Sequence, residues 1–73
     1  MIDLQKGQIV FIKLPKMDNS IIECEFLGNH ERGEAWGVFR PIRIAYNATS
    51  ITYLEVVLRV QVIAHQSQII KNK

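Results

Sequence analysis

Three arginines and one tryptophan are the side chains of this sequence best suited to binding chemistry. Arg40, Arg43 and Arg59 carry permanent charge, and Trp36 is the single tryptophan among 73 residues. Positive charge combined with aromatic stacking is how a sheet binds single-stranded nucleic acid. The pattern therefore predicts a basic, aromatic outer sheet face. Its expected members are Lys13, Lys16, Trp36, Phe39, Arg40, Arg43, Tyr53 and Arg59.

Three carboxylates oppose this interpretation. Glu23, Glu25 and Glu55 are expected on the same outer face as the arginines. Carboxylates opposite arginines on neighbouring strands form ion pairs that cancel the positive potential. The formal net charge of +2 is also too small to argue for nucleic acid alone. An ordinary solvated face with paired charges is therefore the favoured alternative.

Trp36 has two interpretations of its own. It stands between Ala35 and Gly37, so one ring face could be left open as a platform for stacking or for docking a peptide. The alternative is a partly buried aromatic ring that closes one end of a barrel. The second is favoured on general grounds, and both would place the ring near the end of a loop.

No catalytic set is evident. Residues 30–34, HERGE, combine a histidine with two carboxylates, but a glycine-rich surface loop lacks the dry pocket that acid–base catalysis needs. Cys24 shares a strand face with Ile22 and Phe26, which indicates a small core residue. One cysteine and two histidines cannot build a usual zinc site. We expect a non-enzymatic chain without metal or cofactor.

Two short segments bear on the enzyme alternative. GQIVFI and GVFRPIRI resemble the first strand and the Arg-Pro element of the plasmid-maintenance toxin ribonucleases, whose folds contain a small barrel. This resemblance implies Arg40 as a catalytic candidate. The two segments cover under a quarter of the chain, and the sequence is not assigned to that family. A ribonuclease therefore ranks third, behind two binding hypotheses.

The elements that must position these residues have a period of two. Residues 51–63, ITYLEVVLRVQVI, alternate apolar and polar side chains and predict a long central strand. Residues 8–14 and the segment IIECEFL predict a hairpin, with Val10, Ile12 and Leu14 facing inward. Ile22, Cys24 and Phe26 are expected to face inward from the second strand.

A third strand is expected at residues 38–46, with Pro41 marking an edge or a bulge because proline has no N–H to donate. About five antiparallel strands in a chain of this length predict an all-β fold. The expected architecture is a small SH3-like barrel, with an OB-like barrel second. Closing the sheet would hide its edges while one face forms the core.

Length and composition predict one domain over residues 1–73, cytoplasmic and without a membrane span. Two functions remain open. The first is a module that binds nucleic acid through the basic face; the second is a protein-interaction subunit that uses an aromatic groove or a strand edge. A homodimer is also predicted, because Val57 and Ile63 lie on the otherwise polar side of residues 51–63. Ile69 and Ile70 would complete its interface.

Overall fold

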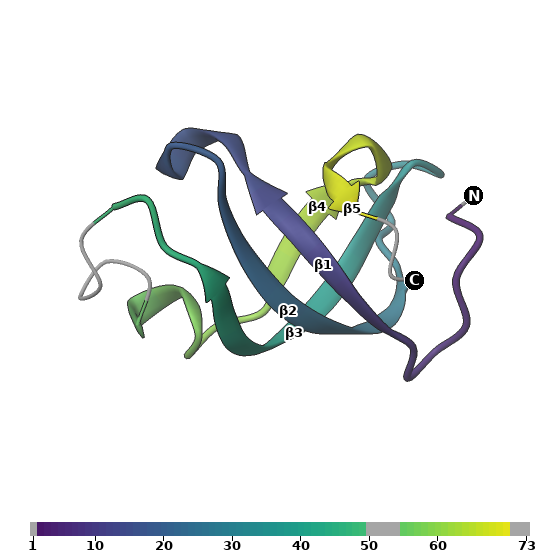
Figure 1. Cartoon of the computed structure of the whole chain (residues 1–73). Coiled ribbons are helices and arrows are strands. Elements are labelled where there is room, and N and C mark those ends of the chain that lie inside the picture. Colours follow the sequence, from purple (N-terminus) through teal and green to yellow (C-terminus); the bar gives the residue numbers. More distant parts are fainter. Residues whose placement is uncertain (1, 50–54, 71–73) are drawn as a thin grey trace.

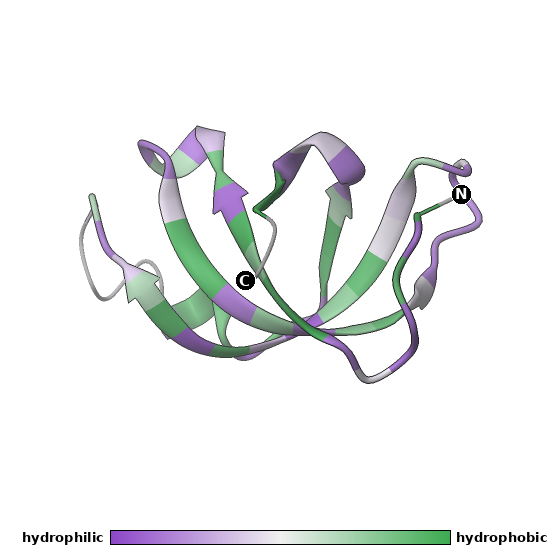
Figure 2. Cartoon of the chain, turned by 45° about the vertical axis from the view of Figure 1, so that its right-hand side comes forward, coloured by the Kyte–Doolittle hydropathy of each residue, from purple (hydrophilic) through white to green (hydrophobic). Residues whose placement is uncertain are grey.

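The computed structural model of the chain describes residues 2–49 and 55–70 and shows one curled antiparallel sheet (Figure 1). Within these residues the strand order is β4-β3-β2-β1-β5. The sheet curves into a half-barrel with one concave face (Figure 2). The elements are β1 (Ile9–Leu14), η1 (Pro15–Met17), β2 (Ser20–Asn29), β3 (Trp36–Tyr46), β4 (Val62–His65), η2 (Gln66–Gln68) and β5 (Ile69–Ile70).

The β1–β2 hairpin is confirmed, and its turn contains the 3-10 helix η1. Asp18 and Asn19 follow η1 with φ of 55° and 61°. This left-handed region favours short polar side chains such as these. The Asn19 amide donates to the Leu14 carbonyl oxygen at 3.1 Å and closes the turn. The hairpin then continues in register from Leu14↔Ser20 to Ile9↔Glu25.

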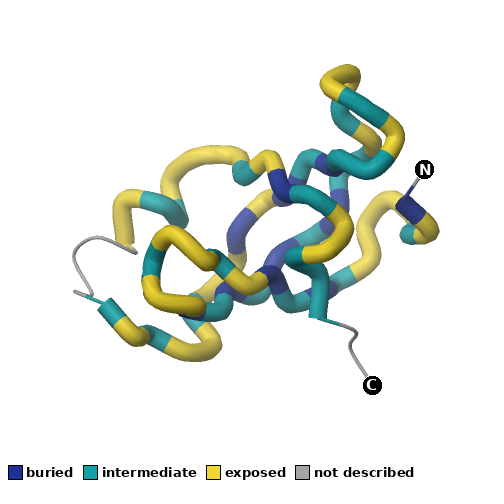
Figure 3. Tube along the Cα trace, turned by 90° about the horizontal axis from the view of Figure 1, so that it is seen from above, coloured by how far each residue is buried: buried dark blue, intermediate teal, exposed yellow. Residues whose placement is uncertain are grey.

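Alternation along β1 and β2 builds the core, as predicted. Val10 and Ile12 are buried, and Leu14 packs against the core from its rim. Most buried residues lie in β1, β2 and β3, with Ile2 before β1 and Ala64 in β4; Figure 3 colours the chain by burial. The buried hydrophobic residues are Ile2, Val10, Ile12, Ile22, Cys24, Phe26, Phe39 and Ala64.

Strand β3 starts two residues earlier than predicted, at Trp36. Its register against β2 shifts between Glu23 and Cys24, whose partners are Arg43 and Pro41. The bulge predicted at Pro41 is therefore confirmed. The extra residue, Ile42, is left exposed. Such a bulge bends the strand and increases its twist, which helps the sheet to curl.

The predicted strand at residues 51–63 is wrong over most of its described part. Residues 55–57 form a helical turn, and only Val62 and Ile63 belong to a strand, β4. The Arg59 amide donates to the Val56 carbonyl oxygen at 3.1 Å, so the chain hydrogen-bonds locally. Strand β3 pairs with β4 only from Trp36 to Phe39. Residues 51–54 of the predicted strand lie outside the described residues.

The half-barrel is completed by the step from β4 through η2 to β5. Strand β5 returns to β1, with Phe11↔Ile70 and Ile12↔Ile69 as partners. The His65 ring Nδ1 accepts from the Ser67 amide at 3.1 Å, and the Gln68 side chain accepts from the His65 amide at 2.9 Å. These reciprocal bonds form a capping box at the N-terminus of η2, in which the amides of His65 and Ser67 both find acceptors. Among the described residues, no helix has the length and apolar character to cross a membrane.

Candidate functional site

The outer face of β2 and β3 carries ion pairs rather than an open basic stripe. The Arg40 Nη2 lies 2.7 Å from the Glu25 Oε1, and the Arg43 Nε lies 2.6 Å from the Glu23 Oε1. Both pairs join residues that are direct partners in the β2–β3 register. Two of the three arginines of the predicted face are therefore matched by carboxylates.

Phe39 was predicted on this outer face, and the structure places it in the core instead. Its side chain is fully buried, and its ring lies 5.4 Å from that of Phe26. Successive strand residues point to opposite faces, so an outward Arg40 requires an inward Phe39. The two residues could never have shared a face within one regular strand.

The remaining predicted residues are dispersed. Lys13 is exposed on β1, and Lys16 is exposed in η1. Arg59 is exposed in the turn after residues 55–57 and does not belong to the sheet. Tyr53 lies outside the described residues. The structure therefore assembles Arg40 and Arg43 on one face of β3 but does not join them to a continuous basic and aromatic surface.

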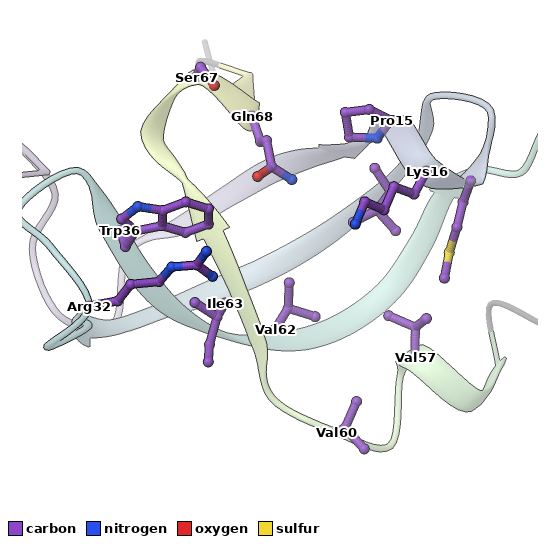
Figure 4. A pocket seen from close by; sticks show the side chains of 12 residues that line it. Pro15, Lys16, Arg32, Trp36, Val57, Val60, Val62, Ile63, Ser67 and Gln68 are labelled. Atoms are coloured by element: carbon purple, nitrogen blue, oxygen red, sulfur yellow. The ribbon is translucent and has the colours of Figure 1, made fainter.

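A different site is visible beside β4. A hollow of about 660 Å³ opens between the β1–β2 turn, the loop before β3, and the segment that leads into β4 (Figure 4). Its described lining is largely apolar and contains two cations and no carboxylate. The lining residues are Leu14, Pro15, Lys16, Met17, Arg32, Trp36, Val57, Val60, Val62, Ile63, Ser67 and Gln68. We call this feature the Trp36 hollow.

Trp36 forms one end of the hollow, with its ring held by neighbours on several sides. The guanidinium carbon of Arg32 lies 4.2 Å from the centroid of the Trp36 ring, which is a cation–π contact. The His65 ring meets it edge-on, with centroids 5.1 Å apart. The ring is half-buried. Trp36 is therefore a partly buried ring that packs on β4 and also lines the hollow, and its use as a docking platform stays a prediction.

The glycine at position 37 is required by the packing of the core, and not to leave the Trp36 ring open. A Cβ at this position would lie 2.9 Å from both Ile2 Cδ1 and Phe26 Cε1, and 3.0 Å from Phe39 Cε1. These distances are below ordinary van der Waals contact. The absence of a side chain at this position therefore lets the three core side chains pack against the start of β3, next to Trp36.

Hydrogen bonds fix two walls of the hollow. The buried Ser20 hydroxyl donates to the Met17 carbonyl oxygen at 2.7 Å and accepts from the Ala48 amide at 3.0 Å, so it fastens η1. On the opposite wall, the Gln68 Nε2 donates to the Lys13 carbonyl oxygen at 3.2 Å. Walls held in this way lose little further freedom when a ligand binds.

Sequence reasoning missed most of this site. The sequence predicts a solvated loop at residues 30–34, which contains Arg32, and of the η1 residues it predicts only Lys16 as a binding residue. The one available signal was the position of Arg32 four residues before Trp36, but a loop of unknown conformation gives no reason to stack them. The Val57, Val60 and Val62 positions were assigned to a strand, so their contribution to a cavity wall was not foreseen.

Chemistry by a nucleophile or a metal has little support among the described residues. Burial, with a smaller contribution from Glu23, raises the pKa of the Cys24 thiol to about 12, so it stays neutral. No group of three or more histidine, cysteine, aspartate or glutamate side chains gathers in residues 2–49 and 55–70.

Comparison with known proteins adds no relative. No protein-family model, no curated protein and no solved structure matches the chain. The resemblance to the plasmid-maintenance toxin ribonucleases therefore rests on its two short segments alone.

Proposed function

We propose that this chain is a protein-interaction module that receives a peptide segment of its partner in the Trp36 hollow. The observation that carries the proposal is the lining itself. Apolar side chains from η1, β4 and the segment before β4 surround one half-buried tryptophan. Cavities of this size with few polar groups are typical binding sites, and tryptophan is enriched at the energetic centres of protein interfaces.

For the finer architecture we propose the SH3-like barrel. Strands β1 to β4 follow one another in the sheet, and β5 returns to β1 after the 3-10 helix η2. This connectivity supports an SH3-like arrangement over the OB-like alternative. The function is argued from the hollow and not from the fold, since small barrels serve many activities.

Nucleic-acid binding is the second candidate, and the charge distribution supports it less. It needs cations that can contact phosphates, whereas Arg40 and Arg43 already contact Glu25 and Glu23. Stacking on Trp36 remains open to a nucleobase as well as to a peptide. The candidate is therefore kept as an outcome of the experiment.

Two matched valines test the proposal. Val60 is 56% exposed and lines the hollow, while Val56 is 61% exposed in the same segment and is not among the lining residues. Immobilised wild-type chain is incubated with lysate of the cell that produces it, after nuclease treatment and in high salt. We expect a defined protein partner that Val60→Asp loses and Val56→Asp retains. Equal capture by both variants, or recovery of nucleic acid alone from untreated lysate, would contradict the proposal.

A further inference from the structure

We infer that the segment received by the Trp36 hollow is apolar in its middle and acidic towards both ends. This inference rests on the proposed function and specifies its ligand. Arg32 lies at the Trp36 end of the hollow, and Lys16 lies towards the other end on η1 (Figure 4). Val62, one of the apolar lining side chains, lies between the two cations. A complementary ligand needs carboxylates at corresponding positions on either side of apolar groups.

The pairing of charges within the chain supports this view. The sheet arginines Arg40 and Arg43 each have a carboxylate partner at 2.7 Å or closer. Arg32 and Lys16 have no such partner anywhere in residues 2–49 and 55–70. Other exposed cations, such as Lys13 and Arg59, also lack one there, and Lys16 and Arg32 differ from them in lining the hollow, where an external anion can reach them.

The Arg32 side chain is oriented for this role. Its guanidinium carbon lies over the Trp36 ring, 4.2 Å from the centroid, and this cation–π contact restrains the side chain at the edge of the hollow. Stacking uses the face of the guanidinium and leaves its N–H edges to donate to a carboxylate. A restrained arginine loses less conformational freedom on binding than a mobile one, so its contact contributes more to affinity.

Neighbouring carboxylates do not fill the site. Glu31 and Glu34 belong to the same loop as Arg32, but both are exposed and neither is among the lining residues. The two uncharged polar lining residues already have partners: the Gln68 amide bonds to Lys13 and His65, and the Ser67 hydroxyl lies 2.9 Å from the His65 Nδ1. The cations are therefore the lining groups that distinguish one peptide from another.

The experiment is a selection from a random dodecapeptide library displayed on phage, against immobilised wild-type chain. We expect enriched sequences with aspartate or glutamate on both sides of apolar residues. One enriched peptide, and its version with Asn and Gln in place of Asp and Glu, are then titrated while Trp36 fluorescence is recorded. Trp36 is the only tryptophan, so the signal reports on the hollow itself.

Charge-reversed variants complete the design. We expect Lys16→Glu and Arg32→Glu each to lower the affinity for the acidic peptide by about three- to tenfold, because one exposed ion pair is lost and a repulsion is introduced. Lys6→Glu, an exposed cation outside the lining, changes net charge equally and should have little effect. The amidated peptide should bind wild type and variants alike. Circular dichroism confirms that each variant is folded.

The contrary outcomes are distinct. Enriched peptides that are apolar without acidic residues, with affinities indifferent to Lys16→Glu and Arg32→Glu, would overturn the inference and leave the proposed function standing. No enrichment over the Val60→Asp chain would overturn the proposed function as well. Quenching of Trp36 by a single-stranded oligonucleotide but by no selected peptide would assign the hollow to nucleic acid and overturn both.

Discussion

The Arg40 guanidinium contacts the Glu25 carboxylate across the β2–β3 ladder, with Nη2 and Oε1 2.7 Å apart. The same relationship repeats one step along the sheet between Arg43 and Glu23. Because the pairs are cross-strand partners, the strand register itself brings each carboxylate to its arginine. The outer face is thereby built with mixed charge.

Removing the two carboxylates should expose the arginines to phosphate. We expect Glu23→Gln combined with Glu25→Gln to raise affinity for single-stranded DNA at low salt. The slope of log affinity against log salt should steepen by up to about 1.4, at roughly 0.7 for each phosphate that a released arginine neutralises. The control is Glu31→Gln with Glu34→Gln, which changes net charge equally in an exposed loop. Equal increases in affinity for both double variants would show that net charge, not the release of Arg40 and Arg43, governs binding.

The Cys24 thiol makes stability sensitive to alkaline pH. Burial, followed by the Glu23 carboxylate, raises its pKa from 9.0 to about 12. The unfolded chain therefore loses the thiol proton near pH 9, whereas the folded chain keeps it to about pH 12. The stabilisation is complete below pH 9 and is lost as pH rises towards 12.

Urea unfolding at several pH values measures this effect. Between pH 9 and 12 the wild-type free energy of unfolding should fall more steeply than that of Cys24→Ala. The difference in slope should approach, at most, about 1.4 kcal/mol per pH unit. Other groups titrate in the same window, and the comparison with Cys24→Ala removes their contribution. Parallel slopes would show that the thiol proton is not linked to folding.

The first half of the fold could be predicted from alternation, because its strands are buried on one face only. Alternation places Val10 and Ile12, then Ile22 and Cys24, on the core faces of a hairpin, which the structure confirms, whereas the register between the strands comes from the structure. The same rule failed for residues 55–61. Apolar residues at Val56, Val60 and Val62 satisfy a period of two, but the amides of Arg59 and Val60 donate to the Val56 and Val57 carbonyl oxygens, so this segment hydrogen-bonds locally instead of pairing with β3.

The candidate site was beyond sequence reasoning for a related reason. It is formed by segments far apart in the chain, such as η1 near residue 16 and β4 near residue 62. Periodicity reports which face a residue occupies on its own element, not which turns meet in space. The stack of Arg32 on Trp36 depends on the loop between β2 and β3, whose path no local pattern specifies.

Ser20 should be more important to stability than its size suggests. Its buried hydroxyl links η1 to the chain after β3 through Met17 and Ala48. We expect Ser20→Ala to cost about 1–3 kcal/mol of unfolding free energy, because both hydrogen bonds of the buried hydroxyl are lost, each with a net contribution of roughly 0.5–1.5 kcal/mol. Ser67→Ala removes an exposed hydroxyl and should cost under about 0.5 kcal/mol. Similar losses in urea titrations of both variants would contradict this account.

A methyl group at Gly37 should overpack the core. The added Cβ would stand 2.9 Å from Ile2 Cδ1 and from Phe26 Cε1. We expect Gly37→Ala to lower the free energy of unfolding by about 1–3 kcal/mol, the usual range for an extra buried methyl. Trp36 adjoins this position, so its emission maximum should also shift. Combining Gly37→Ala with Ile2→Ala, which vacates space beside the new methyl, should cost less than the sum of the two single changes; strict additivity would show that they do not meet.

Val57 bears on both stability and the predicted homodimer. The homodimer predicted from the sequence uses Val57 as an interface residue, but Val57 packs against the core in the structure. We now expect Val57→Lys to cost about 1–3 kcal/mol, because a charged side chain would replace core contacts. Val56→Lys, at a position 61% exposed, should stay within about 0.5 kcal/mol of wild type.

Light scattering at several concentrations, run beside the urea titrations, separates packing from association. The homodimer itself stays a prediction, and it requires a mass of twice 8.4 kDa that falls on dilution. The apolar residues left exposed near β4 include Val60 and Ile63, so a dimer would use the rim of the Trp36 hollow. In that case Val60→Asp should give 8.4 kDa at all concentrations while remaining folded. A constant 8.4 kDa for the wild type would reject the dimer and leave the hollow open to a different protein.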